Sequence, residues 1–350
     1  MGLEELRSEI REKDREIVRL ISERTALAEE VAKVKLSQGG QVRNKEVEEK
    51  VISRYVEMGS EKGLDPEIMK DIASTLIRQA VDSESALMGT TDDRKVSIIG
   101  GAGKMGAWTA ALLGRTGCEV SIIDTAVDNG LTIADCKDSD IVIVSVPIHS
   151  VRLILGKLKD ICGRDTLIFD LSSLKTPFVD ELKEMAKTMK VCSVHPMFGP
   201  SARSMYDRNL IICDCGNKEA VNETLALFDN RGGNIRIMDV ERHDDYMSYV
   251  LGLTHAVNIA LFTVLERSGM SFKDLRTVAS TTFNKGLETN QSVAMEDPML
   301  YYEIQHMNGS RDRMWSLFSQ AVDEIKKASM DEDPEAFKRI MDAGREYFDS

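Results

Sequence analysis

From residue 3 to residue 36, apolar side chains recur at three- and four-residue spacing, and neither Gly nor Pro interrupts them before Gly39. This spacing predicts one amphipathic helix, which at 1.5 Å per residue would be roughly 50 Å long. A helix that is longer than a small domain is wide needs a partner along its length, so we expect a coiled coil or an intertwined helical dimer. The apolar positions are Leu3, Leu6, Ile10, Ile17, Leu20, Ile21, Leu27, Ala28, Val31 and Val34.

Two further helices are predicted before residue 90. One covers about residues 44–60, and the other begins at Asp65 and Pro66, where a capping residue precedes a first-turn proline, and continues to about Met88. A short polar stretch follows at 89–94, after which the pattern becomes strand-like. We therefore expect residues 1–90 to form an all-α domain of three helices.

The middle of the chain alternates strands with helices, which predicts a doubly wound, mostly parallel α/β sheet over residues 94–240. Strands are expected at 96–100, 120–124, 141–146, 167–171 and, more weakly, near Val191 and at 210–213. The strand pattern ends after about Val240, and helices are expected at 244–266, 272–287 and 313–348. The fold class is therefore multidomain, with an all-α C-terminal domain over residues 241–350.

Length and charge restrict the possible partners. The chain has 350 residues, which suits two or three domains, and its formal net charge of -13 disfavours nucleic acid and anionic membranes as partners. Residues 1–20 lack the apolar run of a signal peptide, and no later segment approaches about 18 uninterrupted apolar residues. We expect a cytoplasmic enzyme whose small anionic substrates bind to local clusters of Arg and Lys.

The six cysteines lie in apolar contexts, which in a reducing compartment indicates free thiols in the core. Cys213 and Cys215 form a C-x-C pair, but neither a His nor a second Cys pair stands at the spacing of a zinc site. No metal is predicted.

A glycine-rich segment at 97–106 ends the first predicted strand and opens a helix. Gly101, Gly103 and Gly106 fit the pattern G-x-G-x-x-G, in which the glycines allow a tight turn, the approach of a pyrophosphate, and close packing of helix on strand. Lys104 and Met105 begin the helix beside them. Asp124 ends the second strand, where a carboxylate can bind the adenosine ribose hydroxyls and repel a 2′-phosphate. The segment therefore predicts a Rossmann dinucleotide site that prefers NAD to NADP.

A histidine follows a short strand in the motif HPMFGP at 195–200. We expect this loop at the carboxyl end of the sheet, where His195 beside a nicotinamide could accept a substrate hydroxyl proton while hydride leaves. The segment DLSSLK at 170–175 ends the preceding strand on the same edge, so Ser173 could bind the same hydroxyl or orient the histidine.

Together with His243 and His255, which flank residues 246–254, these motifs resemble the prephenate dehydrogenase family over residues 95–350. The resemblance implies NAD-dependent oxidation of prephenate to 4-hydroxyphenylpyruvate, with His195 as the base, His243 and His255 lining the cleft, and a C-terminal dimerisation domain. Many family members have an arginine for the side-chain carboxylate in the helix that corresponds to 283–292. Here Lys285 is the only cation in that segment, and an ammonium cannot form the bidentate pair of a guanidinium.

Two cations of the first helix point the same way. Arg24 and Lys35 are eleven residues apart, about three turns, whereas Arg7 lies on another face roughly 25 Å from Arg24. If these cations share a site, Arg7 must come from a second, antiparallel copy of the chain. Each cation by itself is also compatible with ordinary solvated helix charge.

Residues 3–88 resemble the helical class of chorismate mutases, in the pattern L-R, E-R, V-x-K-x-K, V-R and a polar residue in the last helix. The resemblance implies a homodimer in which Arg24 and the partner's Arg7 bind the chorismate carboxylates, and Asn44 and Glu48 hold its ring hydroxyl. Lys35 and Glu84 would contact the ether oxygen, which a carboxyl group helps only when protonated. Mutase activity should then fall as pH rises through neutrality, and Glu84→Gln should remove this dependence.

Two alternatives compete with this bifunctional interpretation. The helical domain could be a dimerisation or regulatory module without mutase activity, because Val47 stands where relatives often have arginine. The remainder could be another Rossmann oxidoreductase, such as a hydroxy-acid or imine reductase, although those normally use a helical lysine instead of HPMFGP.

Overall fold

The structure is a computed structural model of the whole chain. It describes residues 2–37, 45–87, 92–229 and 231–350, but not the side chains of 36–37 and 84–87. The packing of its Cα atoms divides the chain into two compact units. Unit 1 comprises 1–146, 153–172 and 180–238, and unit 2 comprises 147–152, 173–179 and 239–350.

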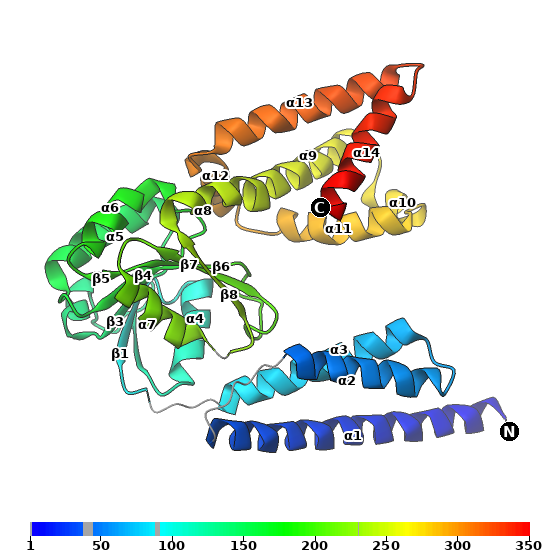
Figure 1. Cartoon of the computed structure of the whole chain (residues 1–350), viewed down its shortest axis with the longest axis horizontal. Coiled ribbons are helices and arrows are strands. Elements are labelled where there is room, and N and C mark those ends of the chain that lie inside the picture. Colours follow the sequence, from blue (N-terminus) through cyan, green and yellow to red (C-terminus); the bar gives the residue numbers. More distant parts are fainter. Residues whose placement is uncertain (1, 38–44, 88–91, 230) are drawn as a thin grey trace. The chain divides into compact units, whose positions relative to one another are not determined.

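The three predicted N-terminal helices are confirmed (Figure 1). They are α1 (Leu3–Ser37), α2 (Lys45–Ser60) and α3 (Pro66–Leu87). The Asp65 carboxylate accepts a hydrogen bond of 2.8 Å from the amide of Glu67, which caps α3 as the Asp-Pro pair predicted. Helix α3 packs against both α1 and α2, and the buried side chains Ala32, Ala73 and Ile77 lie at this contact.

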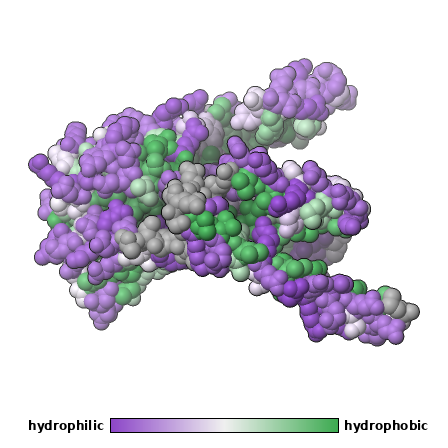
Figure 2. Space-filling view, turned by 60° about the horizontal axis from the view of Figure 1, so that its bottom comes forward, coloured by the Kyte–Doolittle hydropathy of each residue, from purple (hydrophilic) through white to green (hydrophobic). Residues whose placement is uncertain are grey.

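The apolar face of α1 is largely exposed in the single chain. Leu3 and Ile10 near its start are 65% and 60% exposed, and Leu27 is 68% exposed. Figure 2 shows hydrophobic residues gathered in patches on one face of a mostly hydrophilic surface. Exposure of so many large apolar side chains along one helix is what a helix that binds a partner would present.

A five-stranded parallel sheet forms the centre of the nucleotide-binding part of unit 1. Its strands are β1 (Lys95–Ile99), β2 (Glu119–Ile123), β3 (Ile141–Val144), β4 (Leu167–Asp170) and β5 (Lys190–Val191), in the order β2-β1-β3-β4-β5. The β3 and β4 strands are fully buried and apolar except for Asp170 at the end of β4, as parallel strands covered on both faces require. The chain places β2 and β3 on opposite sides of β1, so the strand order reverses there, and such a switch point is where doubly wound sheets bind ligands.

A second sheet follows directly and was not predicted as a separate unit. It has the order β6-β7-β8, with β6 (Ser193–Pro196), β7 (Asn209–Asp214) and β8 (Asn234–Asp239). β6 and β7 are antiparallel, with His195 opposite Ile211. The strand expected at 210–213 therefore lies outside the parallel sheet. Strand β8 was not predicted, because polar and charged residues alternate with its two isoleucines and the pattern does not indicate a buried strand.

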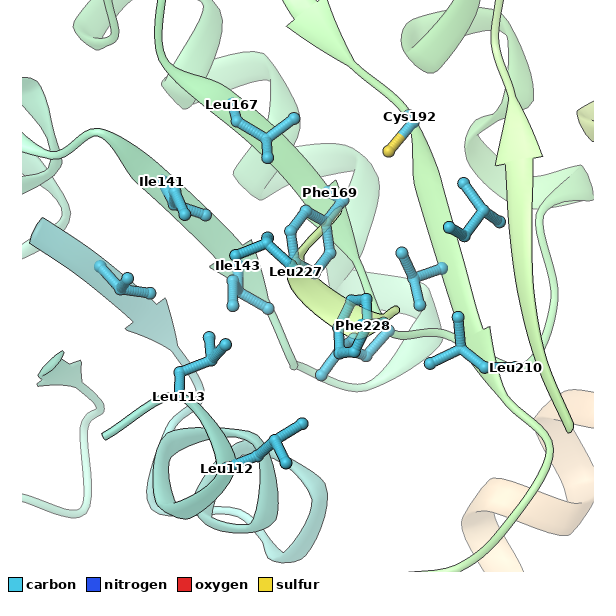
Figure 3. Close-up of a cluster of buried hydrophobic side chains, with 14 of the residues drawn as sticks. Leu112, Leu113, Ile141, Ile143, Leu167, Phe169, Cys192, Leu210, Leu227 and Phe228 are labelled. Atoms are coloured by element: carbon cyan, nitrogen blue, oxygen red, sulfur yellow. The ribbon is translucent and has the colours of Figure 1, made fainter. Parts of the chain in front are cut away.

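Helices cover the parallel sheet and complete its core (Figure 1). They are α4 (Lys104–Gly114), α5 (Ile148–Ile161), α6 (Val179–Ala186) and α7 (Lys218–Phe228), with short 3₁₀ turns at Ile133–Asp138 and Thr176–Phe178. Figure 3 shows Leu112 and Leu113 of α4 and Leu227 and Phe228 of α7 among the strand residues, with the rings of Phe169 and Phe228 6.1 Å apart. The prediction of core thiols is confirmed, because none of the six cysteines is part of a disulfide and five of them are buried.

The C-terminal part is helical as predicted, but its helices are shorter than expected. They are α8 (Val240–Met247), a π-helical turn (Ser248–Leu253), α9 (Thr254–Arg267), α10 (Phe272–Thr277), α11 (Thr281–Ala294), α12 (Pro298–Met307), α13 (Arg311–Met330) and α14 (Glu335–Asp349). The single helix expected at 272–287 is wrong, because Ser280 caps a new helix by accepting from the Phe283 amide. The helix expected at 313–348 is interrupted before Pro334, and α12, which Asp297 caps, was missed.

By length and composition alone, one stretch among the described helices, Val240–Arg267, would suffice to cross a membrane. It consists of α8, the π-helical turn and α9, and a core helix of a soluble protein meets the same criterion. Its apolar window is 22% buried in the single chain, and the stretch contains the buried, hydrogen-bonded pair His243 and Asp244.

Candidate active sites

In the glycine loop between β1 and α4, neighbouring atoms lie so close that Gly100, Gly101 and Gly106 have no room for a side chain. Gly100 has φ +77°, and a Cβ atom there would lie 2.2 Å from the carbonyl oxygen of Ser145. A Cβ on Gly106 would lie 2.5 Å from the carbonyl oxygen of Gly100, and one on Gly101 would lie 2.7 Å from Ile122. The left-handed turn is therefore at Gly100, one residue before the glycine that the pattern indicated, while Gly106 has the close packing that was expected.

The start of α4 offers its backbone amides to a ligand. Gly103 is its N-cap residue and its first turn has no side-chain cap among the described residues, so a ligand rather than a side chain could bind the first amides. A Cβ on Gly103 would approach the Gly100 carbonyl oxygen at 3.2 Å. Lys104 is exposed and Met105 is half-buried on the first turn. This arrangement of small residues and a helix start without a side-chain cap fits the pyrophosphate of a dinucleotide.

Asp124 directly follows β2, beside the glycine loop. One carboxylate oxygen accepts from the amide of Ala102 at 3.0 Å, and the other accepts from the amide of Ala126 at 2.9 Å. These bonds fix a half-buried carboxylate next to the turn, in the position where the ribose of a dinucleotide would be bound.

His195 lies on β6 and not in a loop, which corrects the prediction. Its side chain is 3% exposed, and the strand is paired with β7. Two residues earlier on the same strand, the hydroxyl of Ser193 donates to the buried carboxylate of Asp170 at the end of β4, which joins the antiparallel sheet to the parallel one. The imidazole is therefore held by a strand, which positions it more rigidly than a loop would.

The segment after β4 and the helix α8 are held together inside unit 2. The carboxylate of Asp244 accepts from the amide of Lys175 at 3.0 Å and from the amide of Thr176 at 2.7 Å. It also lies 2.6 Å from Nδ1 of His243, which is fully buried. Burial opposes ionisation of Asp244, but the hydrogen bond and charge of His243 and the bonds from Thr176 outweigh it and lower the pKa. Ser173, half-buried, is in the segment that this carboxylate fixes.

His255 on α9 is buried against an aromatic ring. It stacks on Tyr301 with ring centroids 4.0 Å apart, and its Nδ1 atom has no hydrogen-bond partner among the described residues. Burial lowers the pKa of His255 to about 4, so the imidazole is neutral at physiological pH. Lys285, the other predicted substrate residue of this unit, is exposed on α11.

In the helical domain, the structure separates the cations of α1 as expected. Arg24 is half-buried and donates a hydrogen bond of 3.0 Å to the carbonyl oxygen of Leu76 on α3, and Lys35 is half-buried as well. Arg7 is exposed and pairs with Glu4 of its own helix at 2.8 Å. Within one chain Arg7 therefore does not join the other two cations.

Glu48 is half-buried on α2 and accepts a hydrogen bond of 3.2 Å from the phenol of Tyr206. Asn44 lies outside the described residues, and of Glu84 only the backbone, within α3, is described. Sequence reasoning missed Tyr206, Asp244 and Tyr301. Asp244 adjoins His243 in sequence, which was a usable signal, but no local pattern indicates the contacts of the two tyrosines.

Three protein-family profiles match the chain, and together they cover most of it. They are chorismate mutase type II over residues 6–85, the nucleotide-binding domain of prephenate dehydrogenase over 112–237, and the dimerization domain of prephenate dehydrogenase over 239–343. The last two matches meet at 237–239, where β8 gives way to α8, whereas the nucleotide-binding match begins at 112, inside α4.

Similar proteins include the T-protein of Haemophilus influenzae, which is 26% identical over 99% of this chain and 92% of that protein. The T-protein of Enterobacter agglomerans is 25% identical over 96% of this chain and 91% of its own length. Among solved structures, prephenate dehydrogenase from A. aeolicus has a TM-score of 0.57 at 23% identity, over 73% of this chain and 99% of that one, which shows a shared fold.

A mutase profile on the three helices, dehydrogenase profiles on the parts that follow, and T-proteins matched over nearly the whole chain all indicate the same two activities. The chain therefore belongs to the family of bifunctional enzymes of tyrosine biosynthesis that join a chorismate mutase to an NAD-dependent prephenate dehydrogenase.

Proposed function

We propose that residues 1–90 rearrange chorismate to prephenate, and that residues 94–240 and 241–350 together oxidise prephenate to 4-hydroxyphenylpyruvate. The product of the first reaction is the substrate of the second, which gives the fusion a chemical reason. Both compounds are small dicarboxylates, and this agrees with cations at selected positions in a chain whose net charge is -13.

In the mutase, the rearrangement needs no covalent catalysis, so the side chains only hold the compact conformer and stabilise charge on the ether oxygen. Arg24 and the partner subunit's Arg7 bind the two carboxylates. Lys35 and a protonated Glu84 contact the ether oxygen, and Asn44 and Glu48 hold the ring hydroxyl.

The observation that supports this assignment best is the division of cations on α1. Arg24 and Lys35 are half-buried, and Arg24 contacts α3, whereas Arg7 is exposed on a helix whose apolar residues are also exposed. A second copy packed along α1 would cover those apolar residues and bring its own Arg7 to Arg24. We therefore propose a homodimer, which the match to a dimerization domain also supports.

In the dehydrogenase, His195 accepts the proton of the ring hydroxyl, and Ser173 binds the same oxygen or orients the imidazole. NAD, when bound, supplies a hydride acceptor, and aromatisation of the ring drives loss of carbon dioxide. The glycine loop 100–106, with Lys104 and Met105, holds the pyrophosphate, and Asp124 binds the ribose and excludes a 2′-phosphate.

The substrate is held by groups from the C-terminal domain. His243 and His255 line the cleft, and the low pKa of His255 makes it a neutral hydrogen-bonding group and not a counter-ion for a carboxylate. Lys285 is then the cation that we assign to the side-chain carboxylate. We place the enzyme in the cytoplasm, with neither nucleic acid nor membrane as a partner.

The test uses the full chain with chorismate, first without and then with NAD. We expect chorismate to disappear and prephenate to accumulate without NAD, and NADH and 4-hydroxyphenylpyruvate to form in equal amounts once NAD is added. Oxidation of added prephenate without any consumption of chorismate would mean that the helical domain is a dimerisation or regulatory module without mutase activity.

A further inference from the structure

The hairpin that carries His195 also reaches the helical domain. Its strands are β6 and β7, and the connecting segment 197–208 contains Tyr206, all within unit 1. The phenol of Tyr206 donates to Oε2 of Glu48 on α2 at 3.2 Å. The dehydrogenase part thus touches a carboxylate that belongs to the other catalytic centre.

The ring of Tyr206 packs against the helical domain as well. It contacts the buried side chains Ile77 and Val81 of α3, each 5% exposed. Gly232, with φ +77°, fits against Val81 and Tyr206 so closely that a Cβ there would lie 2.9 Å and 3.3 Å from them. A second polar contact, from the Ser204 hydroxyl to the Asp82 carboxylate, joins the same segment to α3.

The segment that carries Tyr206 is fixed by contacts with the nucleotide-binding part. Met205 is buried in the core of the nucleotide-binding part, and the amide of Arg208 donates to its carbonyl oxygen at 3.0 Å across a tight turn. Asp207 completes this turn with φ +53°, a left-handed conformation that aspartate tolerates. Earlier in the segment, the indole of Trp108 donates to the carbonyl oxygen of Ala202 at 2.7 Å.

We propose that Tyr206 is a positioning residue of the mutase site, supplied by the dehydrogenase part of the chain. It fixes the Glu48 carboxylate for the ring hydroxyl of chorismate, and this inference rests on the role proposed for Glu48. Because the ring hydroxyl does not react, the contact acts equally on substrate and transition state. Its loss should therefore raise KM and leave kcat unchanged.

The experiment compares four variants of the full chain by their steady-state consumption of chorismate: Tyr206→Phe, Glu48→Ala, the double variant and Asp82→Ala. Tyr206→Phe keeps the ring and removes only the hydrogen bond, so KM should rise about three- to tenfold with kcat within about twofold. Asp82→Ala removes the other contact between the same elements and should change neither constant. In the Glu48→Ala background, Tyr206→Phe should have no further effect.

Oxidation of added prephenate by Tyr206→Phe should equal that of the wild type, which verifies folding. The proposal would be overturned if KM stayed unchanged in Tyr206→Phe, or if Tyr206→Phe had the same effect with and without Glu48. A lowered KM would also overturn it, because the phenol would then compete with substrate for Glu48. If Glu48→Ala is too slow to assay, the KM values of Tyr206→Phe and Asp82→Ala for chorismate decide between the outcomes. A wild-type chain that never consumes chorismate would refute the mutase function itself, which is a distinct outcome.

Discussion

The imidazole of His255 lies flat against the ring of Tyr301, with centroids 4.0 Å apart and planes 21° from parallel. Only 7% of His255 is exposed, and burial lowers its pKa from 6.5 to about 4. The folded protein therefore resists a proton that the unfolded chain accepts. This stacked pair links the stability of the C-terminal domain to pH.

The first prediction concerns stability in acid. Between pH 6.5 and about 4 the unfolded state binds the additional proton, so stability falls as pH decreases through this window, by at most about 3 kcal/mol for this group. His255→Phe keeps a ring against Tyr301 but cannot titrate. Thermal unfolding of both proteins at pH 7 and pH 4.5 should show a smaller acid shift for the variant, and equal shifts would contradict the assigned pKa.

The second prediction concerns Asp244, which holds the segment containing Ser173 and the ring of His243. Asp244→Ala leaves two amides and a buried imidazole without their acceptor. We expect kcat/KM for prephenate to fall at least about tenfold, because small displacements of positioned groups cost rate steeply. Chorismate consumption by the same preparation should stay normal. A parallel loss of both activities would instead indicate general unfolding.

The sequence predicted well those features whose signal is local. The spacing of apolar residues gave the three N-terminal helices within a residue or two, and Asp65 before Pro66 marked the start of α3 correctly. The glycine pattern located the closely packed turn between β1 and α4, although the left-handed residue is Gly100. These features depend on neighbours in the chain and not on distant partners.

Features that depend on distant partners were not predictable. His195 was expected in a loop because nothing nearby shows that residue 211 pairs with it. A single helix was expected at 272–287, but Ser280 caps a new helix there. Composition alone does not show whether a serine caps a helix or lies within one. The contact of Tyr206 with Glu48 spans 158 residues and leaves no trace in either local pattern.

The third prediction uses two glycines of one helix. In Gly106→Ala the new methyl group would lie 2.5 Å from the Gly100 carbonyl oxygen, so the glycine loop must shift. We expect KM for NAD to rise at least about tenfold. Gly114, at the end of the same helix, has open space around it, so Gly114→Ala should leave KM unchanged and stability equal or higher by up to about 1 kcal/mol. If both variants bind NAD normally, the loop does not cradle the cofactor.

The fourth prediction concerns the choice of dinucleotide. Asp124→Ala removes the carboxylate that would bind the ribose hydroxyls and repel a 2′-phosphate, so the ratio of kcat/KM for NAD to that for NADP should fall at least about tenfold. Asp138→Ala makes the same change of net charge at an exposed position and should leave the ratio alone. An unchanged ratio in Asp124→Ala would place the discrimination elsewhere.

The last prediction tests whether Arg7 serves the other subunit. Arg7→Ala and Arg24→Ala should each abolish most mutase activity, because each removes one carboxylate ligand from every site. In a mixed dimer, however, one site keeps Arg24 of the first chain and Arg7 of the second, and the other site loses both. Co-expression of the two variants should therefore restore mutase activity to about a quarter of wild type, since about half of the dimers are mixed and each has one intact site. If both arginines acted within one chain, mixing could restore nothing, and the exposed position of Arg7 beside Glu4 would be only surface charge.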